Sequence, residues 1–351
     1  MWRTRSAIVA IVGMALWAGA TGVAHAAAPA PYSVTPELIA AAREEGTVVF
    51  YTATDVQVAE ELASKFEETY PGISVQVERS GSERVFQRLG QEYSARIYNA
   101  DIIETSDAVH FLLLKRNDWL QAAVPEDVAN LWPAGKRDPD GFYAAYRADL
   151  SVIAYNTNLV SPEDAPTSFA DLLEPKWNGK LVKAHPGYSG TIMTATYILS
   201  NLLGWEYFER LGQQNVMQVQ SSTETPKKLA MGERSVQVDG NEYVVTRLKE
   251  AGIPLEIVYP EEGTPLVVGN AAIMKNAPHP NAAKLFYAFM FSLEAQQLNS
   301  DFGGLRSFHP GVVEREGRTP LSEINLLESR PEDIEPHIRT IKQRYERYFG
   351  I

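Results

Sequence analysis

Cysteine is absent from all 351 residues of the chain. Without cysteine the chain has no disulfide, no thiolate metal site, no catalytic thiol and no cysteine to carry a lipid anchor. The fold must therefore be stabilised by burial of apolar surface alone. A chain of this length does so more easily as two lobes than as one.

Basic residues are also few: the chain has 32 Lys and Arg but 44 Asp and Glu, which gives a net charge of −12. A nucleic-acid-binding protein needs a basic surface, so this balance argues against nucleic acid as a partner. The sequence also lacks the motifs of phosphate-binding loops, zinc proteases and dinucleotide sites. Past the N-terminal region, no run of residues is long and apolar enough to cross a membrane.

The N-terminal region has the pattern of a secretory signal. Residues 1–5 are cationic, an apolar run extends from Ala7 to about Ala20, and Ala24-His25-Ala26 has the small-x-small form of a cleavage site. The apolar run is shorter than the roughly twenty residues of a transmembrane helix. We therefore expect residues 1–26 to be a signal peptide and the mature protein to be periplasmic, without a lipid anchor.

Strands and helices alternate along the rest of the chain. Apolar runs rich in β-branched and aromatic residues at 47–53, 73–79 and 100–106 predict buried strands, with amphipathic helices between them. This order predicts a mostly parallel sheet covered by helices on both faces. The long β-like stretch 142–158 predicts a strand that crosses into a second α/β lobe.

A second extended stretch, 265–274, returns toward the first lobe, so two crossings predict a hinge. We expect the N-terminal lobe to contain residues 27–146 and 265–308, and the C-terminal lobe to contain residues 147–264 and 309–351. Two hinged lobes are typical of a cleft that closes on a ligand.

Side chains with hydroxyl groups follow the ends of the predicted strands. Because ligands of parallel α/β sheets bind beyond the carboxyl ends of the strands, these are candidate binding residues. They are Thr52, Thr54, Ser80, Ser82 and Ser106, and Ser82 is also expected to cap the helix through Tyr93. Arg147, just before the crossing, and Arg84 are candidate partners for a carboxylate or phosphonate, because arginine offers a bidentate fork.

A helix is predicted within the stretch AHPGYSGTIMTATYILSNLLG, residues 184–204. Ser189 is expected to be its N-cap and Gly204 to end it. One interpretation stops at this capping role. The other is that the amides and hydroxyls of Ser189, Gly190 and Thr191 bind an anion at the helix N-terminus.

The same stretch contains GYSGT, which resembles the nucleophile elbow Gly-x-Ser-x-Gly. The match fails at its last position, where Thr191 replaces glycine, and His185 precedes the serine rather than following it. We therefore do not expect an enzyme, and no cofactor is implied.

Several segments resemble the family-1 extracellular solute-binding proteins. They are GTVVFYTATD at 46–55, ADIIETSDA at 100–108, MGERSVQVDGNEY at 231–243 and NAPHPNAAKLFYAFMFSLEAQQ at 276–297. Within that family, the chain is most similar to the ferric-iron-binding branch, which includes binders of phosphonates and other small organic anions. The resemblance implies the type II periplasmic binding fold and delivery of a captured ligand to the permease of an ABC importer. We also expect the protein to be a monomer.

The resemblance also implies where a ligand binds. An anion would rest on Ser189, Gly190 and Thr191, with Ser221 or Ser222 as a further contributor. Iron binders of the family carry a tandem tyrosine, where this chain has Glu242 and Tyr243 after Asn241. The first-loop histidine of that branch falls near Asp55, and its third-loop glutamate near Ser106. If iron is bound, Asp55, Glu242 and Tyr243 are its candidate ligands.

We favour a small solute with a carboxylate or phosphonate group over ferric iron, because the usual iron ligands are incomplete. In that interpretation Glu242 pairs with an amine of the solute and Tyr243 donates a hydrogen bond. Ferric iron binding stays an alternative. A third alternative is a ligand sensor that docks on a membrane sensor kinase instead of a permease.

Overall fold

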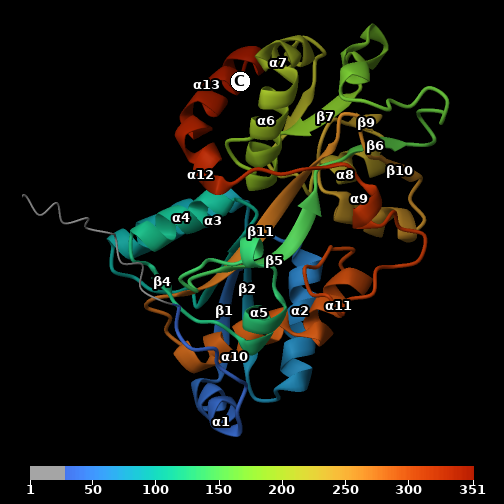
Figure 1. Cartoon of the computed structure of the whole chain (residues 1–351). Helices are drawn as coiled ribbons and strands as arrows, with labels where there is room; N and C mark the ends of the chain where they lie inside the picture. Colours follow the sequence, from blue (N-terminus) through green and yellow to red (C-terminus); the bar gives the residue numbers. More distant parts are fainter. Residues whose placement is uncertain (1–27) are drawn as a thin grey trace, which may run out of the picture.

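The computed structural model describes residues 28–351, and the expected signal peptide lies outside the described residues. Two β-sheets, each with its own helices, stack one above the other in Figure 1. We call the lower sheet and the helices packed on it lobe 1, and the upper sheet with its helices lobe 2. This arrangement agrees with the two α/β lobes that the sequence predicts.

Lobe 1 is built on a seven-stranded sheet in which β12, β11, β3, β1 and β2 follow one another, while β4 and β5 pair with β11. Its strands are β1 (Thr47–Thr52), β2 (Ser74–Arg79), β3 (Ile102–Thr105), β4 (Leu120–Gln121), β5 (Ala144–Leu150), β11 (Thr264–Met274) and β12 (Leu326–Leu327). Its helices are α1 (Pro36–Glu45), α2 (Val56–Thr69), α3 (Ser82–Ser94), α4 (Ala108–Arg116), α5 (Glu126–Leu131), α10 (Pro280–Phe291) and α11 (Leu293–Asp301).

The sheet of lobe 1 is mixed, so the expectation of a mostly parallel sheet is wrong. β1 runs parallel to β2 and β3, as the β-α-β order predicts. β11 runs antiparallel to β3, β4 and β5. The antiparallel pairs arise because β11 enters the sheet from lobe 2, and local strand-helix order does not encode that direction.

Lobe 2 has a five-stranded sheet in the order β10-β6-β9-β7-β8. Its strands are β6 (Ile153–Asn156), β7 (Leu181–Ala184), β8 (Met217–Val219), β9 (Val236–Gln237) and β10 (Leu255–Val258). Its helices are α6 (Gly190–Leu203), α7 (Trp205–Gly212), α8 (Thr225–Ala230) and α9 (Glu242–Glu250). The remaining helical segments are α12 (Pro331–Ile334), α13 (Ile338–Phe349) and the short 3₁₀ turns η1 (Ala134–Lys136), η2 (Ala170–Leu173), η3 (Pro175–Trp177), η4 (Leu321–Glu323) and η5 (Glu335–His337).

The core of lobe 1 is rich in aromatic side chains. Phe66 of α2 packs edge-on against Phe286 and Phe289 of α10, with ring centroids 4.9 and 5.4 Å apart. All three side chains are buried, so two helices distant in sequence cover the same face of the sheet. Burial of large apolar side chains such as these stabilises a fold that contains no disulfide.

The structure confirms some of the helix N-caps predicted from the sequence and not others. Ser189 is the N-cap of α6 and accepts a hydrogen bond from the Ile192 amide, as expected. Ser82 is not a cap: it is the first residue of α3, and Gly81 occupies the cap position without a side-chain bond. Asn241 stands at the N-cap of α9, but its side chain makes no capping bond.

Two strands continue between the lobes. The stretch predicted as one crossing strand forms β5 in lobe 1 and β6 in lobe 2, separated by Ser151 and Val152. β11 pairs with β5 along most of its length, so both crossings lie side by side (Figure 1). The expected lobe boundaries at 146/147 and 264/265 fall within β5 and at the start of β11, and they remain a prediction.

The C-terminal region contacts both lobes. We call residues 325–337, which contain β12, α12 and η5, the strap. β12 pairs with β11, α12 packs on α4 of lobe 1, and α13 packs on α6 and α7 of lobe 2. Ile334 of the strap shares one buried apolar cluster with Val109 of α4 and Met193 of α6. The strap therefore ties the two lobes together on one side.

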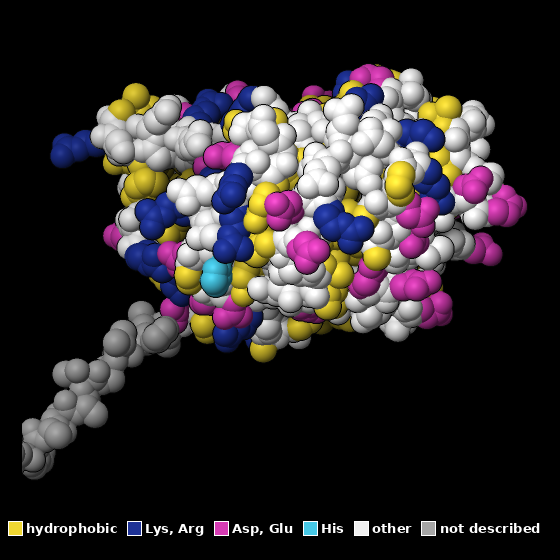
Figure 2. Space-filling model, turned by 90° about the horizontal axis from the view of Figure 1, so that it is seen from above, with side chains coloured by type: hydrophobic (Ala, Val, Ile, Leu, Met, Phe, Trp, Pro, Cys, Tyr) yellow, Lys and Arg dark blue, Asp and Glu magenta, His cyan; other side chains and the backbone are white. Residues whose placement is uncertain are grey.

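On the surface seen in Figure 2, acidic and basic side chains are interspersed, with hydrophobic side chains in small groups between them. Within residues 28–351, no helix has the length and apolar character needed to span a membrane.

Replacing Ile334 with alanine should destabilise the protein by about 2–5 kcal/mol, because the strap then loses a buried contact to both lobes. Chemical unfolding followed by fluorescence measures this change. Val313→Ala is the control: Val313 also lies in the C-terminal region but is 71% exposed, so its effect should stay within about 0.5 kcal/mol. Equal effects of the two substitutions would contradict the role assigned to the strap.

Candidate functional site

The N-termini of three helices meet where lobe 1 faces lobe 2. The hydroxyl oxygens of Ser82, in the first turn of α3, and Ser106, just before α4, lie 3.0 Å apart. A Cβ atom on Gly190, the first residue of α6, would lie 2.5 Å from the backbone nitrogen of Asp107, the N-cap of α4. Each of these helix ends carries partial positive charge and unpaired amides. Their convergence makes this point of the interface suited to an anion.

Hydroxyl groups from both lobes surround that point. On lobe 2, Ser189 donates to the hydroxyl of Ser222 over 3.2 Å. Thr191 is 1% exposed, and its hydroxyl has no hydrogen-bond partner in the part of the chain that the structure describes. A buried hydroxyl without a partner costs free energy unless a ligand or water binds it. Thr191 is therefore a candidate ligand contact.

Arg79, at the end of β2, bridges the two lobes. Its Nη2 lies 3.2 Å from the Ser221 hydroxyl and 3.1 Å from the Thr223 hydroxyl, and its Nε donates to the carbonyl of Thr54 over 3.2 Å. Arg79 was not among the site residues predicted from the sequence. Its position as the last residue of a predicted parallel strand was the signal that pointed to it, because that end of the strand faces the ligand.

A small cavity of about 150 Å³ opens beside Arg79 between the lobes. It is lined by Ser80 and Arg84 of lobe 1 and by Tyr188, Gln220 and Ser221 of lobe 2, among others. Arg84 donates to the side-chain oxygen of Gln220 across the interface. The cavity thus places two guanidinium groups next to the hydroxyls of lobe 2.

Thr52, Thr54 and Arg147 lie deeper in lobe 1, around the buried carboxylate of Glu104. The two threonine hydroxyls donate to Glu104 Oε2 over 2.5 and 3.0 Å, and Arg147 Nε donates to Oε1 over 3.0 Å. Arg147 also pairs with Asp149. Burial disfavours the charged guanidinium, but Asp149 and Glu104 outweigh burial and raise the pKa of Arg147. The charge of Arg147 is thus balanced within the protein, and these side chains support the site from beneath.

Asp55 and Tyr243, two of the candidate iron ligands, meet across the interface. The Tyr243 hydroxyl accepts a hydrogen bond from the Asp55 amide over 3.1 Å. The Asp55 carboxylate binds Lys227 at 2.9 Å and Arg247 at 3.0 Å. Burial raises the pKa of Tyr243, which disfavours the phenolate that a ferric ion requires.

Glu242, the third candidate, faces a different set of partners. Its carboxylate accepts hydrogen bonds from Arg306 at 2.7 and 2.9 Å, from Arg318 at 2.7 Å and from the Tyr259 hydroxyl at 2.5 Å. With both oxygens occupied, Glu242 does not offer a free carboxylate to an amine of a solute, contrary to our interpretation of the sequence. Among residues 28–351, no group of three or more acidic or histidine side chains is arranged to hold a metal ion.

Comparison with known proteins identifies the family. Residues 52–297 match the model of the bacterial extracellular solute-binding proteins, so the chain belongs to that family. A probable ABC transporter periplasmic-binding protein of Sinorhizobium fredii is 21% identical over 287 residues, which cover 78% of this chain and 79% of the relative. An uncharacterized protein of Haemophilus influenzae is 35% identical over 141 residues, so the match spans only 40% of that relative and 39% of this chain.

Solved structures confirm the type II periplasmic binding fold. The periplasmic binding protein AfuA from Actinobacillus pleuropneumoniae, solved with exogenous fructose-6-phosphate bound, has a TM-score of 0.80 and 23% identity. The alignment covers 87% of this chain and 99% of AfuA. Iron-bound HitA from Pseudomonas aeruginosa has a TM-score of 0.72 and 23% identity, over 85% of this chain and 99% of HitA. The chain is thus a solute-binding protein with this fold.

Replacing Glu242 with glutamine should destabilise the protein by about 3–5 kcal/mol at neutral pH, because Arg306 and Arg318 then lose their buried counter-charge. Burial alone would raise the pKa of Glu242, but the two arginines and Tyr259 outweigh it and lower the pKa. The stabilisation is therefore fully present above the unfolded-state pKa of about 4.3 and is lost as pH falls through the lower folded-state pKa.

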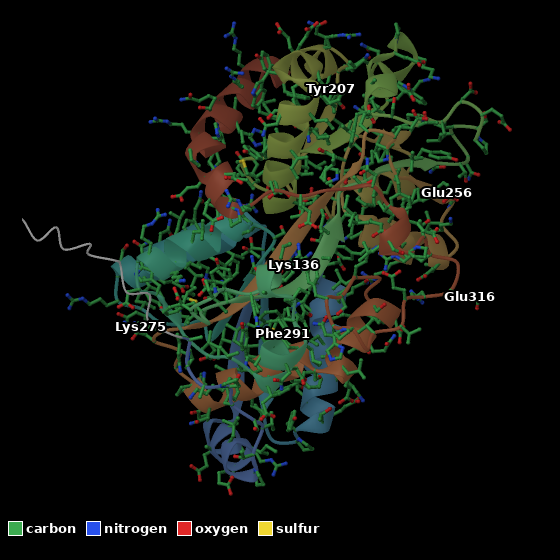
Figure 3. All side chains as sticks on the ribbon, viewed as in Figure 1. Lys136, Tyr207, Glu256, Lys275, Phe291 and Glu316 are labelled. Carbon is green, nitrogen blue, oxygen red and sulfur yellow. The ribbon has the colours of Figure 1, made fainter. Side chains whose placement is uncertain are left out.

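Chemical unfolding of wild type and Glu242→Gln between neutral and acidic pH measures this difference, which should shrink below about pH 4. Glu316→Gln is the control, because Glu316 is an exposed acidic residue at the edge of the molecule (Figure 3). A gap between wild type and Glu242→Gln that stays constant down to low pH would contradict the assignment of the ion pairs.

Replacing Gly190 with alanine should prevent full closure of the lobes, because the added methyl group would overlap Asp107. Overpacking of this kind costs about 1–3 kcal/mol in the closed state only. Small-angle scattering should then give a larger radius of gyration than for wild type. In Gly90→Ala the new methyl group meets no atom within 4 Å, so an equal expansion of both variants would overturn this explanation.

Proposed function

We propose that the protein is the periplasmic solute-binding component of an ABC importer and that it captures a small organic oxyanion between its lobes. Phosphate esters, phosphonates and carboxylates are the solutes of this kind. The observation that carries the proposal is the convergence of the N-termini of α3, α4 and α6 at one point of the interface. Helix N-termini bind anions through free amides and the positive end of the helix dipole.

The surrounding groups fit the same solute. Arg79 and Arg84 supply positive charge beside the small cavity, and the hydroxyls of Ser189, Thr191 and Ser222 supply neutral donors. The net negative charge of the chain does not oppose binding, because local groups set the potential inside a cleft. The structural similarity to AfuA, which was solved with a sugar phosphate, makes phosphate esters the first compounds to test.

Capture would proceed by closure of the hinge. In the closed arrangement Arg79 of lobe 1 bonds to Ser221 and Thr223 of lobe 2, so a solute in the adjoining small cavity contacts both lobes. A ligand shifts a conformational equilibrium by its difference in affinity for the two states. An oxyanion that neutralises the facing helix ends only when the lobes meet would favour the closed form. The protein itself carries out no reaction in this proposal and acts as a monomer.

Ferric iron is the alternative that one observation favours, because iron-bound HitA has a similar fold. Against it, both carboxylates of the candidate set are held by cationic side chains, and burial raises the pKa of Tyr243. An alternative of another class is docking of the closed protein on a membrane sensor kinase. An adjacent permease and ATPase gene would favour uptake, and an adjacent kinase gene would favour sensing.

Replacing Thr191 with valine should weaken binding of the oxyanion by about tenfold or more, because a hydrogen bond to a charged group contributes roughly 1.5–3 kcal/mol. The fold should be unaffected, since the hydroxyl has no partner among the described residues. Isothermal titration calorimetry with fructose-6-phosphate, aminoethylphosphonate, citrate and ferric citrate would compare the variants.

Thr196→Val is the matched control. Thr196 lies on the same helix, is fully buried and also has an unpaired hydroxyl among the described residues, but it is more than one turn from the helix start. Equal affinity of Thr191→Val and wild type would remove Thr191 from the site. Binding of none of the oxyanions, together with a saturable visible band on ferric citrate that Tyr243→Phe abolishes, would establish iron as the ligand instead.

A further inference from the structure

A second and larger cavity lies between the lobes, beneath the strap. Its volume is about 410 Å³. Lobe 1 contributes Ala108 and Tyr143, lobe 2 contributes Thr194, and residues 328–334 of the strap close it. Lys136, which also lines the cavity, lies near the level where the two lobes meet (Figure 3). We call this space the strap cavity.

The strap cavity lies on the other side of the crossing strands from the Arg147–Glu104 cluster, although Ala108, the first residue of α4, also lines it. Leu266, Val268 and Asn270 of β11 line it, and alternate residues of a strand point to one face of the sheet. Gly269 between them lies against Arg147 instead, where an added Cβ would be 2.9 Å from the arginine Cγ. The strap cavity and the Arg147–Glu104 cluster therefore occupy opposite faces of the crossing strands.

The charged groups around the strap cavity are bonded to other parts of the protein. The ion pairs are Lys136–Glu328 at 2.7 Å, Lys115–Asp138 at 2.6 Å and Arg330–Asp333 at 2.8 Å. Arg137 donates to the carbonyls of Val128 and Ala129, and Glu332 is exposed to solvent. Most charges of the wall are thus paired with an opposite charge, which favours a neutral ligand. Apart from the exposed Glu332, Arg137 is the exception in the described wall, since its guanidinium bonds only to carbonyl oxygens.

Neutral polar groups in the wall lack protein partners. The side chains of Tyr143, Thr194 and Asn270 form no hydrogen bond within the described part of the chain, and of these wall residues only Ser329 has a hydroxyl that is fully buried there without a partner. Thr194 and Asn270 are only 6% and 5% exposed. The buried Ser329 hydroxyl needs a partner, and the other three side chains leave polar atoms accessible to water or to a ligand in the cavity.

We propose that the strap cavity is a second binding site, and that it takes a small neutral polyhydroxylated compound such as a sugar or polyol. The phenol, hydroxyl and amide groups match the hydroxyls of such a compound, while Leu266, Val268 and Ile334 offer an apolar wall to its C–H groups. A cavity of a few hundred cubic ångströms is of the size that encloses a small ligand. Because both lobes and the strap form the wall, an occupant also favours closure of the lobes.

Calorimetric titration of the full mature chain with glucose, fructose, myo-inositol and glycerol tests the proposal directly. At least one of these compounds should bind saturably to wild type and to Thr196→Val, whose altered hydroxyl lies outside the strap cavity. Asn270→Leu, which removes the amide at similar volume, should abolish that binding. Thr194→Val is the milder second variant if Asn270→Leu does not fold, and it should weaken binding severalfold.

Absence of saturable binding of all four compounds would overturn the proposal, and so would binding that neither Asn270→Leu nor Thr194→Val reduces. A second titration adds fructose-6-phosphate to the polyol complex. The expected result is an affinity for the ester increased by roughly fivefold or more, since both ligands favour the closed form. Competition between the two would show that the strap cavity belongs to the site of the solute. The direct polyol titration stands even if no oxyanion binds.

Discussion

The approach of α6 to Asp107 is the contact on which the packing of lobe 2 against lobe 1 depends. Asp107 caps α4 by accepting the Val109 amide, and Ser189 caps α6 in the same way. Two capped helix ends therefore meet directly, and Gly190 allows their backbones to touch. Because both ends carry positive partial charge, their contact is unfavourable unless negative charge lies between or beside them. The Asp107 carboxylate supplies part of it, and a bound oxyanion would supply the rest.

Three acidic side chains near this point are paired with cations, whereas Glu224, which lines the small cavity, forms no ion pair in the described structure. Asp55 is held by Lys227 and Arg247, Glu104 by Arg147, and Glu242 by Arg306 and Arg318. These pairs reduce the repulsion of an anion, although Arg147 is shared between Glu104 and Asp149. Arg79 differs, since its guanidinium bonds only to hydroxyl and carbonyl oxygens in the described structure. A chain of net charge −12 can in this way present positive potential where its lobes meet.

Local sequence signals predicted the elements of the fold and the N-cap at Ser189, because short-range hydrogen bonds and apolar periodicity determine both. They did not predict the direction of β11, which is determined by the return of the chain from lobe 2. They also gave Ser82 a capping role that falls to Gly81. The direction of β11 depends on the path of the chain through lobe 2. The first residue of α3 depends on backbone geometry that the residue types alone do not determine.

The sequence predicted the ion-pair partners of charged residues even less well. Arg147 was expected to face the cleft, yet its partner Glu104 lies 43 residues earlier in the chain. Glu242 pairs with Arg306, which is 64 residues later and reaches it through the C-terminal region. No spacing rule connects such residues, since only the packed fold brings them together. Hydroxyl-rich loops at strand ends were a sound guide to position. The end of the predicted strand also pointed to Arg79, but that Arg79 pairs with no carboxylate among the described residues could be learned only from the three-dimensional structure.

In the proposed function, the free energy of lobe closure depends on whether a solute is bound. When the lobes separate, water can solvate the amides of α6 and the hydroxyl of Thr191, so an empty site costs little. When they meet, the same groups are buried, and an unpaired hydroxyl or amide then carries a penalty of about 1–3 kcal/mol. A solute that satisfies these groups removes the penalty only in the closed state. In the proposed function, the small residues and hydroxyls of the interface would therefore make closure itself sensitive to whether a suitable anion is present.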